Sequence, residues 1–259
     1  MKVEVNGISL NVVEHGKRDL DGVRPSLIFL HYFGASSRAW TEVIAHLCTA
    51  YHCIAPDMRG FGESAAPQSG YTLRDYTDDI SELTLEIEIK KFVLVGHSMG
   101  GKIALAIAAR RPANLDSLIL LAPSPPTPEP IADSERKRLL AGYGDRAAAE
   151  ETLNKITAHP LPTQTFERCI EDALRCSPLA WRAWLEDGSR VDFSHDVRRI
   201  DVPVAVVAGG LDEPLNASLL KREIVERIGN ARLTTLPDAK HLFPLEEFAK
   251  VAGLINNHC

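Results

Sequence analysis

The pentapeptide Gly96-His97-Ser98-Met99-Gly100 places a serine between an apolar run, residues 92–95, and an alanine-rich helical pattern, residues 102–111. A serine at such a strand-to-helix junction sits on a sharp turn, which lifts its hydroxyl clear of the sheet and points backbone N–H groups of the new helix at the same place. The strained backbone of that turn needs small neighbours, which the flanking glycines provide. Ser98 is therefore predicted to be a nucleophile; the alternative is a glycine-rich turn without chemistry.

A serine hydroxyl is a weak nucleophile, so it needs a base within hydrogen-bond reach and a carboxylate that orients the base. Asp212 follows the apolar run 202–208, and Glu213 is the less favourable candidate beside it. Asp212 could instead cap the next helix. His241 is the histidine between the last apolar run and the final helical pattern. The order Ser98, Asp212, His241 predicts a catalytic triad with His241 as general base.

Acyl transfer through a tetrahedral intermediate also needs N–H donors for the oxyanion, each typically worth about 2.7–4 kcal/mol. The backbone N–H of Met99, directly after the nucleophile, is one candidate. The loop after the apolar run 26–30 reads His31-Tyr32-Phe33-Gly34, and its Phe33 N–H is the second. Phe33 could equally be only an apolar wall of the pocket.

The elements that must position these residues follow an alternating pattern. Asn6-Gly7 between two alternating stretches predicts a hairpin turn. Near-continuous apolar runs separated by helical patterns then predict an α/β fold with a mostly parallel, doubly wound sheet covered on both faces. The expected strands are residues 26–30, 53–55, 92–95, 115–121, 202–208 and 233–236. The expected helices are residues 38–48, 73–88, 99–111, 217–228 and 245–256.

One segment departs from this alternation of strand and helix patterns. A proline-rich stretch begins near Ser124, and four amphipathic patterns follow without a β-like run until about residue 196. We therefore expect a core of residues 1–123 and 197–259 and a helical cap, residues 124–196, over the carboxyl ends of the strands. Its helices are expected at residues 134–140, 146–157, 165–174 and 179–186.

The cap and the loops beneath it also suggest which residues line the substrate pocket. Trp181 and Trp184, from the cap, and Leu242, beside His241, predict a mostly apolar pocket. The two tryptophans could instead only hold the cap helices together. Tyr32 could place its hydroxyl near a leaving group or pack its ring under the cap.

Composition excludes several other classes. The net charge of −6 without a basic patch argues against a nucleic-acid partner. Neither a signal peptide nor a membrane span is expected, and the five scattered cysteines suggest no zinc site or disulfide framework, so we expect a reduced, cytoplasmic protein. No basic cluster accompanies the triad in the sequence, so a strongly anionic substrate is not expected. Monomer and homodimer both stay open.

Taken together, the Ser98 pentapeptide, the His31 loop, Asp212, His241 and a loop reading Asp57-Met58-Arg59-Gly60-Phe61-Gly62-Glu63-Ser64 resemble the α/β-hydrolase superfamily, in particular its capped serine esterases. The resemblance covers nearly the whole chain and gives the Asp57 loop a structural role. The sequence departs from the family at Tyr32, where the family usually has glycine. Because tyrosine does not adopt a positive φ cheaply, Gly34 is expected to absorb the bend.

The resemblance implies a serine hydrolase of small or medium carboxylic esters that works through an acyl-enzyme without metal or cofactor. The same scaffold and triad also serve C–C bond hydrolases, lactonases, hydroxynitrile lyases and perhydrolases, and the sequence does not separate these. A slow-turnover ligand receptor that keeps the triad is a further alternative.

Overall fold

A computed structural model describes residues 1–19 and 21–259 of the chain. An eight-stranded sheet with the order β1-β2-β4-β3-β5-β6-β7-β8 runs through the molecule. β2 pairs antiparallel with β1 and β4, and all other neighbours are parallel, so the predicted fold class is confirmed. The strands are β1 (Lys2–Val5), β2 (Ile8–His15), β3 (Ser26–Leu30), β4 (Cys53–Pro56), β5 (Phe92–His97), β6 (Leu115–Leu121), β7 (Val204–Gly209) and β8 (Ala231–Leu236).

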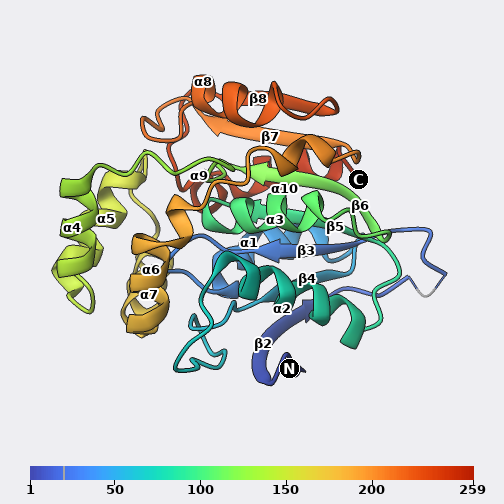
Figure 1. The fold of residues 1–259 in the computed structure, drawn as a ribbon, viewed down its shortest axis with the longest axis horizontal. Helices are drawn as coiled ribbons and strands as arrows, with labels where there is room; N and C mark the ends of the chain where they lie inside the picture. The colour runs from blue at the N-terminus through green and yellow to red at the C-terminus, as the bar shows by residue number, and fades with distance from the viewer. Residues whose placement is uncertain (20) are drawn as a thin grey trace.

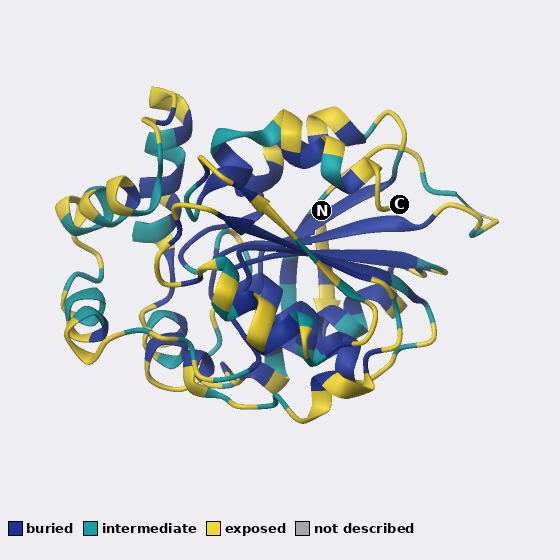
Figure 2. Ribbon diagram, turned by 90° about the horizontal axis from the view of Figure 1, so that it is seen from above, coloured by how far each residue is buried: buried dark blue, intermediate teal, exposed yellow. Residues whose placement is uncertain are grey.

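The predicted hairpin turn is present at Asn6-Gly7, where both residues have positive φ, +47° and +77°. Strand alternation then divides the core between the two faces of the sheet. Leu27 and Phe29 pack on one side, with helices α1 (Thr41–Leu47) and α10 (Phe248–Asn256). Their neighbours in β3 pack on the other side, with α2 (Leu73–Glu86) and α3 (Met99–Ala109). Figure 2 shows the resulting layers, with buried strands between helices whose outer sides are exposed.

The strand register decides where the loops meet. His97 pairs with Leu121, Leu121 with Val207, and Gly209 with Leu236. Parallel strands in this register end at one edge, so the turn after β5 and the loops after β7 and β8 emerge together. Sequence-distant side chains at these three positions are thereby brought to one end of the sheet.

Two expected helices differ from their predictions. The pattern at 217–228 forms a short α8 (Ala217–Leu220) followed by the π-helical η4 (Lys221–Val225), in which the Glu226 N–H donates to the Lys221 carbonyl at 2.9 Å. The pattern at 245–256 begins earlier, as α9 (Phe243–Glu246), and is interrupted at Glu247 before α10. Apolar periodicity cannot distinguish a continuous α-helix from one with a π-helical turn or an interruption, because a widened turn displaces the side chains only slightly.

The segment 124–196 contains α4 (Asp133–Ala141), α5 (Arg146–Ile156), α6 (Thr163–Arg175), α7 (Pro178–Glu186) and η2 (Gly188–Arg190). Figure 1 shows α4 to α7 grouped at the end of the sheet to which the arrowheads of β3 and β7 point. Helix α6 is tied to the strand-and-helix core by ion pairs, including Arg168 to both oxygens of Glu42 at 2.7 and 2.9 Å. Two short 3₁₀ turns, η1 (Ser37–Trp40) and η3 (Asp196–Arg199), complete the described elements.

Across the two described ranges, no helix combines the length and the apolar character needed to cross a membrane.

Candidate active site

Ser98 occupies a strained turn between β5 and α3. Its φ and ψ are +53° and −115°, a backbone conformation that costs a non-glycine residue roughly 1–3 kcal/mol. The turn is held by the Ser98 N–H, which donates to the Leu121 carbonyl at 3.1 Å. Helix α3 begins at the next residue, so its free N–H groups surround the serine. The geometry is that of a nucleophile elbow.

Close packing explains the glycines of this turn. A Cβ on Gly100 would lie 2.2 Å from the carbonyl oxygen of Leu30, and one on Gly96 would lie 2.5 Å from the carbonyl oxygen of Gly100. Both obstacles are backbone atoms of the sheet and helix, which cannot move aside without displacing the elbow. The glycines therefore bring α3 against the strand that carries the serine.

Gly100→Ala is expected to lower the free energy of unfolding by about 3 kcal/mol or more, because the new methyl group overlaps backbone. Gly253→Ala is the matched control, since nothing lies within 4 Å of a Cβ built at this exposed position in α10. There the same substitution should stabilise by about 0.5–1 kcal/mol. Chemical denaturation of both variants measures the difference, and similar changes in the two would contradict the packing argument.

Asp212 and His241 meet although 29 residues separate them. The Nδ1 of His241 lies 2.7 Å from Oδ2 of Asp212, whose side chain is only 3% exposed. The structure thus places Asp212, and not Glu213, against the imidazole. The alternative capping role belongs to Asn216, whose side chain accepts the Leu219 N–H at 3.0 Å.

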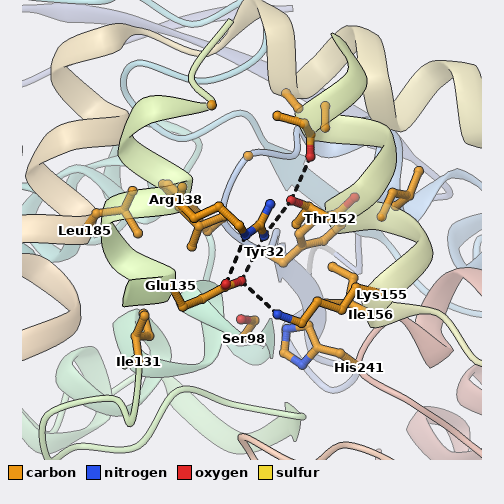
Figure 3. Close-up of a pocket in the computed structure, with 18 of the residues that line it drawn as sticks. Tyr32, Ser98, Ile131, Glu135, Arg138, Thr152, Lys155, Ile156, Leu185 and His241 are labelled. Atoms are coloured by element: carbon orange, nitrogen blue, oxygen red, sulfur yellow. Dashed lines mark hydrogen bonds and ion pairs between the residues drawn. The ribbon is translucent and has the colours of Figure 1, made fainter. Parts of the chain in front are cut away.

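The charges around His241 favour its protonated form. Burial disfavours the imidazolium, but the charge and hydrogen bond of Asp212, with a smaller contribution from Glu129, outweigh it and raise the pKa of His241. With Nδ1 bonded to Asp212, Nε2 makes no hydrogen bond within the described ranges. Ser98 and His241 line the same pocket, and Figure 3 shows them next to each other.

His97, beside the nucleophile, is a residue whose contribution the sequence did not indicate. Its Nε2 lies 2.9 Å from the carbonyl oxygen of His241, and its ring contacts those of Tyr32 and His241. Burial lowers the pKa of His97 well below its usual range, so the ring is neutral and donates this hydrogen bond. His97 thereby fixes the backbone that carries the candidate base.

The two predicted oxyanion donors are unpaired. Within residues 1–19 and 21–259, neither the Phe33 N–H nor the Met99 N–H has a hydrogen-bond acceptor. Phe33 lines the pocket, whereas the Met99 side chain is buried in the core, so only its backbone can serve the site. Gly34 makes the bend of the loop at φ +82°, and Tyr32 keeps a negative φ, as predicted.

A buried histidine braces this loop from behind. His31 Nδ1 lies 2.9 Å from the Tyr32 carbonyl, and its Nε2 accepts the Met58 N–H at 3.1 Å. Asp57 in turn accepts N–H groups of Ser37 and Glu63, at 2.6 and 2.8 Å. The Asp57 loop therefore supports the loop of residues 31–34, which is the structural role expected for it.

A cavity of about 520 Å³ opens in front of Ser98 and His241. Tyr32, Trp181 and Trp184 line it, together with Phe33, whose ring centroid lies 4.4 Å from that of Trp181. Trp181 also joins α7 to α4, because its indole N–H donates to the Leu139 carbonyl at 3.0 Å. The two roles foreseen for this residue are thus combined.

Leu242 lies elsewhere than expected. Its side chain is completely buried in a cluster with Leu153 and Leu161 and is absent from the cavity wall. Its backbone N–H donates to the Ile156 carbonyl at 3.2 Å. Leu242 therefore joins the His241 loop to α5 and does not face a substrate.

The rim of the cavity carries charged residues of both signs, with Glu135 and Asp145 beside three cations. Arg138, Lys155 and Lys240 line it, brought together from α4, α5 and the loop before His241. Glu135 accepts hydrogen bonds from Arg138 and from Lys155, the latter at 3.1 Å, and these contacts lower the pKa of Glu135 to about 2 (Figure 3). The three cations are far apart in sequence, so nothing in the sequence indicated that they lie beside one cavity. Two of them are paired with Glu135, and the expectation that the substrate is not strongly anionic stays a prediction.

Comparison with known proteins identifies the family of the chain. Residues 27–254 match the Alpha/beta hydrolase family, so the chain belongs to this family of enzymes. It is 28% identical to a 2-(acetamidomethylene)succinate hydrolase from Mesorhizobium japonicum, over 85% of this chain and 81% of that protein. It is 26% identical to the non-heme chloroperoxidase CPO-A1 from Kitasatospora aureofaciens, over 88% and 89%. The solved esterase EaEST from Exiguobacterium antarcticum is similar in fold, with a TM-score of 0.90 at 20% identity, covering 99% of this chain and 98% of that one.

Proposed function

We propose that this enzyme hydrolyses small or medium carboxylic esters through an acyl-enzyme formed on Ser98. The observation that carries the proposal is the 2.7 Å contact between Asp212 and His241 at a cavity that also contains a serine on a strained elbow. Each of the three groups alone has ordinary structural uses. Their convergence at one edge of the sheet is the arrangement that acyl transfer requires.

In this mechanism the Ser98 hydroxyl attacks the ester carbonyl while Nε2 of His241 takes its proton. Asp212 holds the tautomer that leaves Nε2 free and stabilises the imidazolium. The N–H groups of Phe33 and Met99 bind the oxyanion. His241 then protonates the departing alcohol, and a water molecule activated by the same ring releases the acid and regenerates Ser98.

The lining of the cavity determines which acyl groups the site can accept. Its apolar wall, formed by Phe33 and by Trp181 and Trp184 of the segment 124–196, suits a short or medium alkyl chain. We take this segment to act as the cap of the site.

The test is the initial rate on p-nitrophenyl acetate, butyrate, octanoate and laurate, together with labelling of Ser98 by a fluorophosphonate. Ester hydrolysis predicts rapid release with a clear optimum among the shorter chains. Negligible release of every ester from protein whose Ser98 is still labelled would reject an esterase. It would favour another reaction of this scaffold (C–C hydrolysis, lactone opening, perhydrolysis or cyanohydrin cleavage) or a slow-turnover receptor.

The pH dependence gives a second expectation. Only neutral His241 can accept the serine proton, so the rate falls as pH drops through the pKa of His241. Because that pKa is raised from 6.5, the acid limb of kcat/KM is expected above pH 6.5. A limb clearly below this value, measured on the best ester, would contradict the charge arrangement described for His241.

The cations of the rim favour a second candidate, hydrolysis of esters or lactones that carry a carboxylate. A distal carboxylate could reach Lys155 and Lys240, and the relative from Mesorhizobium is named for a succinate. The comparison is p-nitrophenyl butyrate against mono-p-nitrophenyl succinate. Preference for the succinate, reduced about tenfold in Lys155→Met as one charge-assisted contact is lost, would support this candidate. Preference of the wild type for the butyrate would rule out this second candidate function.

A further inference from the structure

A second carboxyl group outside the triad faces the site. Glu129 lies in the segment between β6 and α4 and lines the same cavity as Ser98 and His241. Its Oε2 accepts the hydroxyl of Ser124 at 2.6 Å, and the Ser124 N–H donates to the Ser98 carbonyl at 3.0 Å. The carboxyl is thus connected to the nucleophile's own backbone through one fully buried serine.

The backbone of Glu129 is fixed as well. Its N–H donates to the Ser189 carbonyl at 2.8 Å. Lys102, one turn beyond Ser98 in α3, donates to the same carbonyl at 3.3 Å and to the Thr127 carbonyl at 3.0 Å. The proline-rich segment is therefore bound to the helix that carries the nucleophile. Oε1 of Glu129 accepts no hydrogen bond from the described residues, so this oxygen remains available to the cavity.

The position of Glu129 is built by these contacts, yet none of them needs a carboxylate rather than a neutral amide. Ser124 and the Ser189 carbonyl could be satisfied equally by glutamine. What the carboxylate adds at this place is a negative charge at the wall that Ser98 and His241 share.

We propose that Glu129 is a positioning residue for proton transfer, whose carboxylate is a second counter-charge to the His241 imidazolium formed when Ser98 attacks. This inference rests on the proposed serine mechanism. Glu129 touches neither the serine hydroxyl nor the reacting carbonyl, and it acts through His241. Its effect is to make His241 a stronger base and to stabilise the ion pair of the transition state.

The charges that face His241 and Glu129 come from several elements. Asp212 carries the other negative charge, and His97 is neutral. Lys155 and Lys240 also line the cavity. Lys102, Arg136 and His241 itself favour the ionised form of Glu129, against burial, which raises the pKa of this carboxyl. Reciprocally, the negative charge of Glu129 raises the pKa of His241.

The experiment is the rate of Ser98 labelling by a fluorophosphonate as a function of pH, in the wild type and in Glu129→Gln. This readout needs the nucleophile and its base but no natural substrate. Loss of the carboxylate is expected to move the acid limb to lower pH by about 0.5–1 unit and to lower the plateau rate about three- to tenfold. Glu129→Asp, which keeps the charge, should recover part of both changes.

Glu213→Gln is the matched control, because it removes an exposed carboxylate adjacent to Asp212 whose charge does not act on His241. Its acid limb should stay at the wild-type position. If Glu129→Gln does not fold, Ser124→Ala loosens the carboxyl without removing it and should shift the limb the same way by less.

The outcomes separate this inference from the proposed function. An unmoved acid limb in labelled Glu129→Gln, or in Ser124→Ala where that variant replaces it, would overturn the role of Glu129 and leave the serine mechanism intact. Wild-type protein that is not labelled at any pH would overturn the serine mechanism itself, and the inference with it.

Discussion

Replacing Ser98 with alanine is expected to lower ester turnover by about a million-fold, the size of loss seen when a serine triad loses its nucleophile. The reason is that Ser98 stands on the elbow between β5 and α3 beside His241, and among the described residues no other serine lines the cavity. The residual rate should come from the oxyanion donors and from binding in the cavity. Steady-state rates on the best p-nitrophenyl ester, with active-site titration of the wild type, measure the loss.

Ser117→Ala provides the matched control for this substitution. Ser117 lies in β6 and does not line the cavity, and its buried hydroxyl has no hydrogen-bond partner among the residues that the structure describes. Alanine there should leave turnover unchanged and should not destabilise the fold, because an unsatisfied polar group is removed. Turnover in Ser98→Ala close to that of Ser117→Ala would show that another group performs the reaction.

The sequence predicted the inner strands of the parallel part well because they are buried on both faces. The runs at Ser26–Leu30 and Leu115–Leu121 are apolar almost throughout, and their observed bounds equal the predicted ones. The approach of Asp212 to His241 was predictable for a related reason. Once the strands are parallel, the loops that follow β7 and β8 must emerge at one edge.

Contacts that depend on the path of the segment 124–196 could not be predicted in this way. Glu129 follows a run of prolines that has no periodicity, so nothing in the sequence indicated which way its carboxyl turns. The same holds for the rim, where Arg138, Lys155 and Lys240 become neighbours only after α4 and α5 fold over the sheet. Lys102 did leave a signal, since a charged residue in the otherwise apolar α3 must find partners when it is buried.

Asp212→Asn is expected to lower kcat by about ten-thousand-fold, the second large effect. Asparagine keeps the shape of the side chain, so the 2.7 Å contact with Nδ1 can persist. However, an amide N–H facing Nδ1 makes that nitrogen the acceptor and moves the imidazole proton to Nε2, where the serine proton has to go. The variant should therefore fold and bind ester but fail to activate Ser98, which pre-steady-state burst size and kcat measure together.

Two comparisons make this result specific to the carboxylate of Asp212. Because Asp212 raises the pKa of His241, Asp212→Asn should also move the acid limb to lower pH, whereas a loss caused by misfolding would lower the rate equally at every pH. Glu213→Gln changes the neighbouring carboxylate by the same one-atom exchange and should keep a wild-type kcat. The reverse outcome, a large loss in Glu213→Gln and a small one in Asp212→Asn, would mean that the loop after β7 rearranges when substrate binds.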